Sequence, residues 1–254
     1  MHQRGRNIVI TGSSGIAAAA ARQLSREGHS VFVISRDATD CAELVRELGT
    51  HGAGWAAADL QSEEAATTAF ADAASALGRI DAVVAVAGGS ARRFGDGWAH
   101  EMSLDAWYAS LSLNLTTMFL TAREAIRHMR TAGGALVMTS SVLASSPQPD
   151  GFATHGYAAA KAAISGWTRP LAAAYAADGI RVNTVAPGLV QTPMAQRAAE
   201  DPDIVAFAGR KQPLAGGLLT AEQVAAGLAW FVTADTVTGQ VLAIDGGWTV
   251  TSTS

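Results

Sequence analysis

The sequence predicts an α/β fold in which helices cover both faces of a parallel β-sheet. Short apolar runs rich in Val and Ile alternate with longer segments of helical period, and this alternation is typical of such a sheet. The chain has 254 residues, enough for one large domain or two small ones. No linker, repeat or shift in composition divides it, so we expect one domain over residues 1–254. The seven predicted strands are residues 7–11, 30–35, 54–58, 81–87, 135–140, 181–186 and 240–244.

Segments with an apolar stripe at helical spacing lie between these runs. Gly28, Gly78 and Gly179 follow three of them, where the left-handed residue after a helix favours glycine. Residues 88–102 and 195–219 show no regular period. Loops after the carboxyl ends of parallel strands build ligand crevices, so these two segments are candidate substrate walls. The six predicted helices are residues 16–27, 40–48, 62–77, 104–129, 155–177 and 221–233.

Composition excludes several classes of protein. The net charge of −4 argues against a general electrostatic grip on nucleic acid or on an anionic membrane surface. Nothing in the chain reads as a membrane span, and the apolar run near the start is too short for a signal peptide. The single cysteine, Cys41, excludes an internal disulfide and fits a reducing compartment. We therefore expect a cytoplasmic protein whose partner is a small molecule, with no metal site.

A glycine turn follows the first predicted strand and opens the first predicted helix. It comprises Gly12, Ser13, Ser14, Gly15 and Ile16. Such a turn directs free backbone N–H groups at a phosphate, and the helix dipole adds attraction. Glycine matters because a Cβ would block close approach of the phosphate. An ordinary strand-to-helix turn is the alternative, but its place after the first strand of an alternating chain favours dinucleotide binding.

The second and third strands end in residues that suit the adenosine half of such a cofactor. An acidic residue commonly holds the free ribose hydroxyls at the end of the second strand, whereas this chain has Ser35 and Arg36. The guanidinium of Arg36 suits a 2′-phosphate, although it also fits a solvated surface residue. Asp59, followed by Leu60, is either an acceptor for the adenine amino group or the cap of the next helix.

Polar residues that can hold or move a proton lie between residues 114 and 161. Tyr157 and Lys161 are four residues apart and therefore share one helix face, where an ammonium group lowers the pKa of a phenol. Such a pair alone is also common on exposed helices. Ser140 and Ser141 end an apolar strand, and Asn114 interrupts a long apolar helix, where an amide requires hydrogen-bond partners.

Taken together, and in this order, the motifs resemble the classical short-chain dehydrogenase/reductase family. The resemblance extends from Ile8 to Gly247. It includes residues 181–188, Thr192 beyond them, and residues 238–247, which look like the family's last strand. The resemblance implies a doubly wound Rossmann fold with strand order 3-2-1-4-5-6-7. It also implies a homo-oligomer, a tetramer or else a dimer, because two long helices carry apolar residues on more than one face.

The resemblance assigns a catalytic tetrad of Asn114, Ser141, Tyr157 and Lys161. Tyr157 would donate the proton, Ser141 would hold the carbonyl oxygen, and Asn114 would hold a proton-relay water. Lys161 would bind the nicotinamide ribose and lower the pKa of Tyr157. The cofactor would be NADP(H) in preference to NAD(H). The full set of expected cofactor contacts is Gly12, Ser13, Ser14, Gly15, Ile16, Ser35, Arg36, Asp59, Leu60, Ala87, Gly88, Tyr157, Lys161, Pro187, Gly188, Val190 and Thr192.

Three departures from the family pattern concern the site. The glycine turn is one residue shorter than the usual form and has Ala18 in place of the last glycine. Val86 replaces an asparagine that normally braces the centre of the fold. The interval from Ser141 to Tyr157 is long and contains Pro147, Pro149 and Gly151 at the expected substrate mouth.

The expected activity is hydride transfer between NADP(H) and a carbonyl or secondary alcohol, with a bulky or polyketide-type ketone as one candidate substrate. The alternatives are a catalytically silent cofactor sensor or scaffold, and a relative that catalyses epimerisation or dehydration. The expected substrate loops are residues 88–102, 142–154 and 190–219. The candidate apolar wall is Phe94, Trp98, Met194, Phe207 and Trp248.

Overall fold

The structure, a computed structural model, describes residues 5–148 and 151–252. It confirms a seven-stranded sheet with the predicted order β3-β2-β1-β4-β5-β6-β7, in which every neighbouring pair is parallel. Residues 149 and 150 of the expected loop 142–154, including Pro149, lie outside the described residues, as do both ends of the expected domain. The strands are β1 (Asn7–Thr11), β2 (Ser30–Ser35), β3 (Gly52–Ala57), β4 (Ala82–Ala85), β5 (Gly134–Thr139), β6 (Ile180–Pro187) and β7 (Val241–Ile244).

The helices connect these strands as the sequence pattern predicts. Gly28, Gly78 and Gly179 have φ angles of 87°, 72° and 73°, so the left-handed residues expected after three helices are present. The helices are α1 (Gly15–Arg26), α2 (Ala38–Glu47), α3 (Glu63–Leu77), α4 (Leu104–Leu111), α5 (Thr117–Met129), α6 (His155–Tyr175), α7 (Gln196–Glu200), α8 (Pro202–Lys211) and α9 (Ala221–Thr233).

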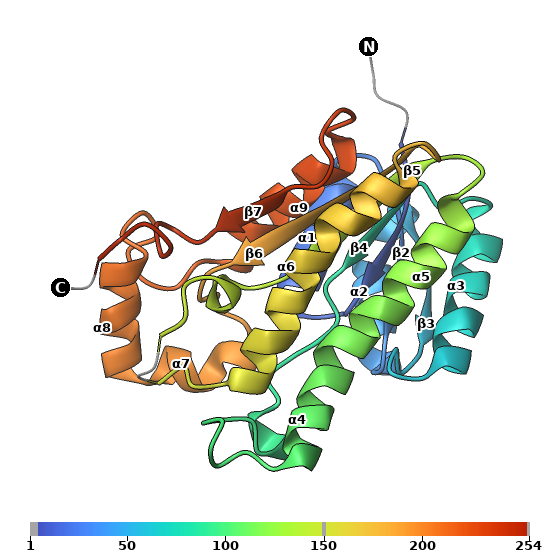
Figure 1. The fold of residues 1–254 in the computed structure, drawn as a ribbon. Coiled ribbons are helices and arrows are strands. Elements are labelled where there is room, and N and C mark those ends of the chain that lie inside the picture. The colour runs from blue at the N-terminus through green and yellow to red at the C-terminus, as the bar shows by residue number, and fades with distance from the viewer. Residues whose placement is uncertain (1–4, 149–150, 253–254) are drawn as a thin grey trace.

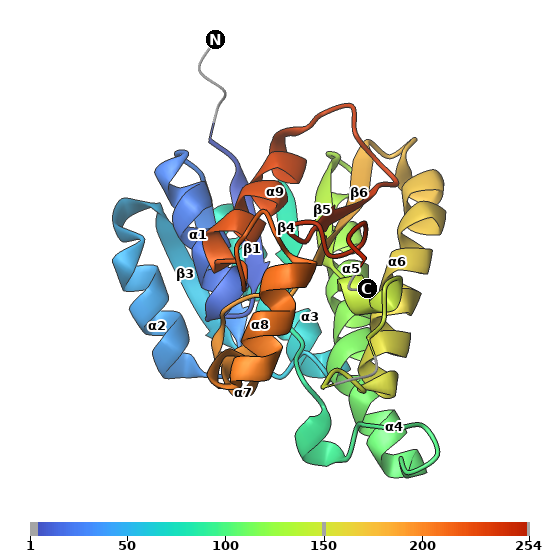
Figure 2. The same cartoon turned by 90° about the vertical axis from the view of Figure 1, so that its left-hand side faces the viewer.

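The sheet separates two apolar cores. Helices α1, α2 and α9 cover one face, and α3, α5 and α6 cover the other (Figures 1 and 2). Successive residues of β1 alternate between them, with Ile8 and Ile10 in the first core and Val9 in the second. Because both faces of the sheet are buried, the strand needs apolar residues at consecutive positions, which explains the continuous apolar runs in the sequence.

The segment 195–219 is more regular than expected. It contains α7 and α8, and a short 3₁₀ turn (Arg92–Phe94) lies within residues 88–102. The side chain of Asp201 caps α8 by accepting hydrogen bonds from Asp203 N and Ile204 N. In both views α4, α7 and α8 lie toward one end of the molecule, where the strands have their carboxyl ends (Figures 1 and 2). These segments therefore stand where a ligand crevice is expected.

The long helix predicted over residues 104–129 is divided. A π-helical turn (Ser112–Thr116) separates α4 from α5 and contains Asn114. Such a turn adds one residue to the helical repeat, which changes the direction in which its side chains point, and it commonly marks a functional position. The apolar pattern continues through the turn, so the sequence does not reveal it.

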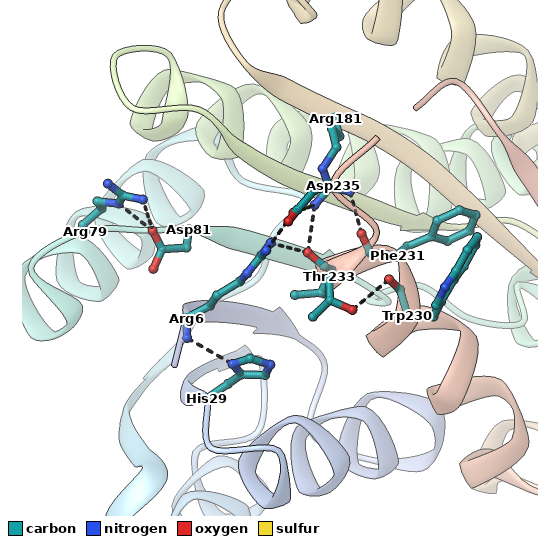
Figure 3. A network of polar contacts seen from close by, with 10 residues as sticks. Arg6, His29, Arg79, Asp81, Arg181, Trp230, Phe231, Thr233 and Asp235 are labelled. Atoms are coloured by element: carbon teal, nitrogen blue, oxygen red, sulfur yellow. Dashed lines mark hydrogen bonds and ion pairs between the residues drawn. The ribbon is translucent and has the colours of Figure 1, made fainter. Parts of the chain in front are cut away.

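Two arginines secure the end of α9 to the sheet (Figure 3). Arg181 of β6 donates to the carbonyl oxygens of Phe231 and Val232 at 2.7 and 2.8 Å, and Arg6 also donates to Val232. Asp235 balances the two positive charges, with Oδ1 at 2.8 Å from Arg6 and 3.8 Å from Arg181. Cations at the carbonyl end of a helix are favoured by its dipole.

Within the described ranges, no helix has both the length and the apolar character needed to cross a lipid bilayer.

Candidate active site

One cavity of about 280 Å³ opens at the carboxyl ends of the central strands. It brings most of the sequence-predicted site residues to a single place. Ser13, Ser35, Arg36, Asp59, Leu60 and Asn114 are not in its wall. The predicted residues in the wall are Gly12, Ser14, Gly15, Ile16, Ala87, Gly88, Ser141, Tyr157, Lys161, Pro187, Gly188, Val190 and Thr192.

The glycine turn leaves room at one side of this cavity. Gly12 and Gly15 have φ angles of 103° and 52°, which only glycine adopts readily. Ser14 occupies the N-cap position of α1 without a side-chain cap, so the first N–H groups of the helix have no side-chain acceptor. Thr192 lies across the turn, with Cγ2 only 3.0 Å from the place that a Cβ on Gly15 would take. Despite its shorter length, the turn fits a dinucleotide diphosphate.

The expected adenosine contacts lie along the end of β2. The hydroxyls of Ser13 and Ser35 are 3.1 Å apart, which links the glycine turn to this strand. Arg36 is exposed and makes no hydrogen bond or ion pair with any other described residue. Asp59 is also exposed, and it accepts from Gln61 N at 3.1 Å. Ser62 caps α3, so the alternative of Asp59 as the helix cap is wrong.

Ser141 and Tyr157 adjoin each other in the cavity wall. The Oγ of Ser141 accepts from Leu143 N at 3.2 Å, and its hydroxyl proton is donated to the phenol oxygen of Tyr157. Burial raises the pKa of Tyr157 to about 12, and a hydrogen bond with Ser141 partly opposes this shift. The expected lowering of the phenol pKa by Lys161 is not found, because burial dominates the shift and Lys161 is not among its causes.

Lys161 lies beneath Tyr157. Its Nζ is 5.5 Å from the centroid of the Tyr157 ring and donates to the carbonyl oxygen of Thr139 at 2.9 Å. Burial lowers the pKa of Lys161 to about 8, since no carboxylate among the described residues pairs with it. An ammonium group with one carbonyl partner has two further N–H bonds to offer within the cavity.

Asn114 is fully buried, and its amide is bound to the loop after β4. Oδ1 accepts from Gly89 N at 3.0 Å, and Nδ2 donates to the carbonyl oxygens of Gly89 and Ser110 at 3.0 and 3.1 Å. A Cβ on Gly88 would lie 2.9 Å from Oδ1 of Asn114 and 3.7 Å from Nζ of Lys161. A side chain at position 88 would therefore collide with the amide oxygen of Asn114, so glycine is required here.

Thr11 supplies the brace that Val86 does not. Its Oγ1 accepts from the backbone N–H groups of Val86 and Ala87 at 3.1 and 3.2 Å. This hydroxyl therefore joins the end of β1 to the segment after β4, and the loop that reaches the cavity stays fixed without the amide usual in the family.

Asp96 is a site residue that the sequence analysis missed. Its buried carboxylate accepts from Gly156 N at 2.9 Å and from Tyr157 N at 2.8 Å, and Ser110 donates a third hydrogen bond at 2.9 Å. The carboxylate thus caps α6 at the residue that carries the phenol. Its partners lie 60 and 61 positions away, so no local pattern could have revealed it.

The aromatic wall agrees only in part with expectation. Met194 and Trp248 line the cavity, and Phe207 packs against Trp248 at a centroid distance of 5.7 Å. Phe94 and Trp98 are not in the wall. Trp98 packs on His155 at 5.6 Å instead. Ser140 is structural as well, since its Oγ donates to the carbonyl oxygen of Lys161 at 2.7 Å.

Comparisons with known proteins agree with this arrangement. A family model described as enoyl-(acyl carrier protein) reductase matches residues 10–249. The cis-4-hydroxycyclohexanecarboxylate dehydrogenase of Sinomonas cyclohexanicum is 38% identical over 96% of both chains. The 3beta-hydroxysteroid dehydrogenase 1 of Eggerthella lenta is 36% identical over 97% of this chain and 95% of its own.

A solved structure of a short-chain type dehydrogenase/reductase from Mycobacterium ulcerans superposes with a TM-score of 0.89 and 28% identity. The match covers 98% of this chain and 91% of the other. Fold, motif order and relatives therefore agree: the chain belongs to the classical short-chain dehydrogenase/reductase family of NAD(P)-dependent oxidoreductases.

Proposed function

We propose that this protein is an NADP(H)-dependent carbonyl reductase and secondary-alcohol dehydrogenase. The observation that carries the proposal is the convergence of Ser141, Tyr157 and Lys161 on one cavity beside the glycine turn. When bound there, the nicotinamide supplies or accepts the hydride. Positioning the carbonyl and moving one proton are left to the chain's own residues.

In reduction, Tyr157 donates its phenolic proton to the substrate oxygen. With its pKa raised to about 12, the phenol is protonated at neutral pH, as an unshifted phenol would also be, and this is the form that an acid requires. Ser141 turns its O–H from the phenol oxygen to the same substrate oxygen and stabilises the developing negative charge. Lys161 holds the nicotinamide ribose with its remaining N–H bonds. Oδ1 of Asn114 accepts one hydrogen bond, from Gly89 N, and would accept a second from a relay water.

A ring-borne secondary alcohol or ketone is the proposed substrate class. The relatives from Sinomonas and Eggerthella are named for a hydroxycyclohexanecarboxylate and for a 3beta-hydroxysteroid, both hydroxyl groups on saturated rings. The cavity of this chain is suited to a substrate with a similar apolar ring, since its wall includes Leu143, Phe152, Met194 and Trp248. We also propose a cytoplasmic location, for which the single cysteine is the support.

The first experiment follows nicotinamide absorbance while the purified protein is mixed with NADPH and a panel of cyclic ketones, from cyclohexanones to steroid ketones. Consumption of NADPH with formation of the alcohol supports the proposal. Binding of NADPH without consumption across the panel, in either direction, contradicts it and favours a sensor or scaffold.

Cofactor preference depends on Arg36. The 2′-phosphate of NADPH is expected to accept a charge-assisted hydrogen bond from this exposed guanidinium, which favours NADPH over NADH by roughly 10- to 150-fold in kcat/KM. Arg36→Ala should remove the preference, while Arg46→Ala, an exposed arginine in the last turn of α2, should keep it. A wild type that prefers NADH, or a preference that survives Arg36→Ala, contradicts this part of the proposal.

A further inference from the structure

Two arginines from distant segments of the chain meet in the wall of the active-site cavity. Arg92 follows β4, and Arg197 belongs to α7. Both donate to the carbonyl oxygen of Gly151, with Nη2–O distances of 3.0 and 3.1 Å. Sharing one acceptor holds the two guanidinium groups close together. The expected substrate loops 88–102, 142–154 and 190–219 each contribute one of these three residues, so all three loops meet at this point.

The positive charge of this pair is not balanced by the residues that the structure describes, which leave out Asp150. No carboxylate among them lies within 4.0 Å of either guanidinium. Asp96 attracts Arg92, but its own oxygens are already bound by two backbone N–H groups and by Ser110. Both arginines are exposed, and partial desolvation, followed by repulsion from Arg197, lowers the pKa of Arg92.

The second arginine pair of the molecule provides a comparison. Arg6 and Arg181 also converge on one shared carbonyl oxygen, that of Val232, but Asp235 lies between them and completes the charge balance (Figure 3). That pair is structural, because it closes the end of α9. The pair in the cavity wall also consists of two guanidinium groups, but no described carboxylate lies between them. It faces the space where the substrate must lie. An anion in that space would relieve the repulsion.

We propose that Arg92 and Arg197 form a binding site for a carboxylate on the substrate, at a distance from the carbonyl group that Tyr157 protonates. The inference rests on the proposed function and narrows its substrate class to cyclic oxo acids and hydroxy acids. Two planar guanidinium groups match the two oxygens of a carboxylate. The apolar residues Phe152, Met194 and Trp248 of the same wall suit the hydrocarbon ring that joins the two ends.

A matched pair of ketones tests the charge directly. With saturating NADPH, kinetics are measured for 4-oxocyclohexanecarboxylate and for its methyl ester, which keeps the ring and the ketone but has no charge. The wild type should have a kcat/KM for the acid at least 10-fold above that for the ester. Arg92→Gln and Arg197→Gln should each raise KM for the acid by roughly 10- to 150-fold, the worth of one charge-assisted hydrogen bond, and change KM for the ester less than about threefold.

Arg93→Gln is the control. This neighbour of Arg92 lies over the ring of Phe94, at 4.6 Å from its centroid, and is not part of the cavity wall. The Arg93→Gln substitution removes the same charge from the same loop, and it should leave the KM values for acid and ester unchanged. An equal effect of Arg93→Gln on the acid would mean that only the net charge of the loop matters, and the proposal would be wrong.

Three other results would overturn the inference. A wild type that prefers the ester has no carboxylate site. Equal rises of KM for acid and ester mean that the arginines only hold the loops together. A rise in KM for NADPH that matches the rise for the acid assigns them to a cofactor phosphate instead.

Calorimetric binding of the acid to the enzyme with NADP⁺ separates this inference from the proposed function. Binding that each Arg→Gln variant weakens 10-fold or more supports the carboxylate site even if neither ketone is reduced. Binding unaffected by both variants overturns it even if the ester is reduced.

Discussion

The phenol of Tyr157 is buried with its pKa raised to about 12, next to an ammonium group whose pKa burial lowers to about 8. Both shifts have the same cause, since desolvation disfavours the charged form of each group. A neutral phenol lies beside an ammonium group that loses its proton more readily than usual. Such groups are suited to exchange a proton with a substrate oxygen rather than to form a stable ion pair.

Tyr157→Phe is expected to abolish turnover while NADPH still binds. The substitution removes the proton donor and keeps the packing of the ring. Steady-state kinetics with a reduced ketone, together with fluorescence titration of NADPH, measure the two effects separately. Tyr175→Phe, at the other end of α6, is the matched control and should keep wild-type activity. More than a few per cent of wild-type kcat in Tyr157→Phe would contradict the assignment.

The buried Lys161 should make the protein more stable as the pH rises from 8 to 10. Its folded-state pKa of about 8 lies below its usual 10.5, so the unfolded chain binds more protons in this interval and stability increases with pH. The full shift corresponds to roughly 3 kcal/mol at about 1.4 kcal/mol per unit. Above pH 10 the raised pKa of Tyr157 acts in the opposite direction, because the unfolded phenol ionises first.

Lys161→Met should flatten this rise. Urea unfolding of the wild type and the variant between pH 7.5 and 10 measures the difference. Parallel curves for the two proteins would show that Lys161 does not titrate as its burial requires.

At the scale of the element, Asp96 ties the loop after β4 to the start of α6. Its carboxylate accepts from Gly156 N and Tyr157 N, and the same loop accepts from His155 N through the carbonyl oxygen of Gly97 at 3.1 Å. Thr154, in the N-cap position, makes no side-chain cap. Helix α6, which carries Tyr157, therefore depends on a loop residue for the cap that its own sequence lacks.

Asp96→Asn should lower kcat more than it changes KM for NADPH. The amide keeps the size but replaces one acceptor with a donor, so one N–H at the start of α6 loses its partner at a cost of about 1–3 kcal/mol. This loss displaces the helix turn that carries Tyr157 and leaves the glycine turn in place. Asp105→Asn, in the first turn of α4, is the control. A loss of stability with unchanged kcat would mean that Asp96 acts on the fold alone.

The elements differ in how well the sequence reveals them. The strand pattern gave all seven strands, because a doubly covered sheet requires consecutive apolar residues. The π-helical turn at Asn114 and the short α7 and α8 were missed. A turn of five residues barely changes an apolar period, and short helices are stabilised by their packing and by the cap at Asp201.

The site was predictable where its chemistry follows local spacing. Gly12 and Gly15, or Tyr157 and Lys161, lie a few residues apart and share one turn or one helix face. The roles of Thr11, Asp96 and the pair Arg92 and Arg197 depend on contacts between distant segments. The predicted direction of the Tyr157 pKa shift was wrong. The effect of burial depends on the whole cavity, which the four-residue spacing from Lys161 does not describe.

At the scale of the whole molecule, two apolar surfaces remain exposed. One lies on α5 and α6, where Phe119 is 43% exposed and its ring packs against Trp167 at 6.0 Å. The other lies on α9 and β7, where Trp230 is 50% exposed and Val241 and Leu242 are also exposed. When each of two separate surfaces pairs with its counterpart on another copy, a tetramer with dihedral symmetry results.

We therefore expect a homotetramer, with Phe119→Glu and Trp230→Glu each reducing it to dimers. A charge in the centre of either surface prevents its burial and leaves the other surface intact. Sedimentation velocity at micromolar concentration distinguishes the species. A monomeric wild type, or a tetramer unaffected by both substitutions, would contradict this prediction.

The position of Trp248 has an optical consequence. Its indole lines the cavity, is 1% exposed, and donates from Nε1 to the carbonyl oxygen of Ser146 at 3.1 Å. Tryptophan emits in the range where reduced nicotinamide absorbs, so this side chain should report on cofactor and substrate through its emission. The other five tryptophans, which dilute the signal, are Trp55, Trp98, Trp107, Trp167 and Trp230.

A variant with those five changed to Phe should lose most of its emission when NADPH binds, and its emission maximum should shift when a ketone follows. Adding Trp248→Phe should abolish both responses. Trp248 would then serve as a built-in fluorescent probe that records each ligand as it enters the cavity.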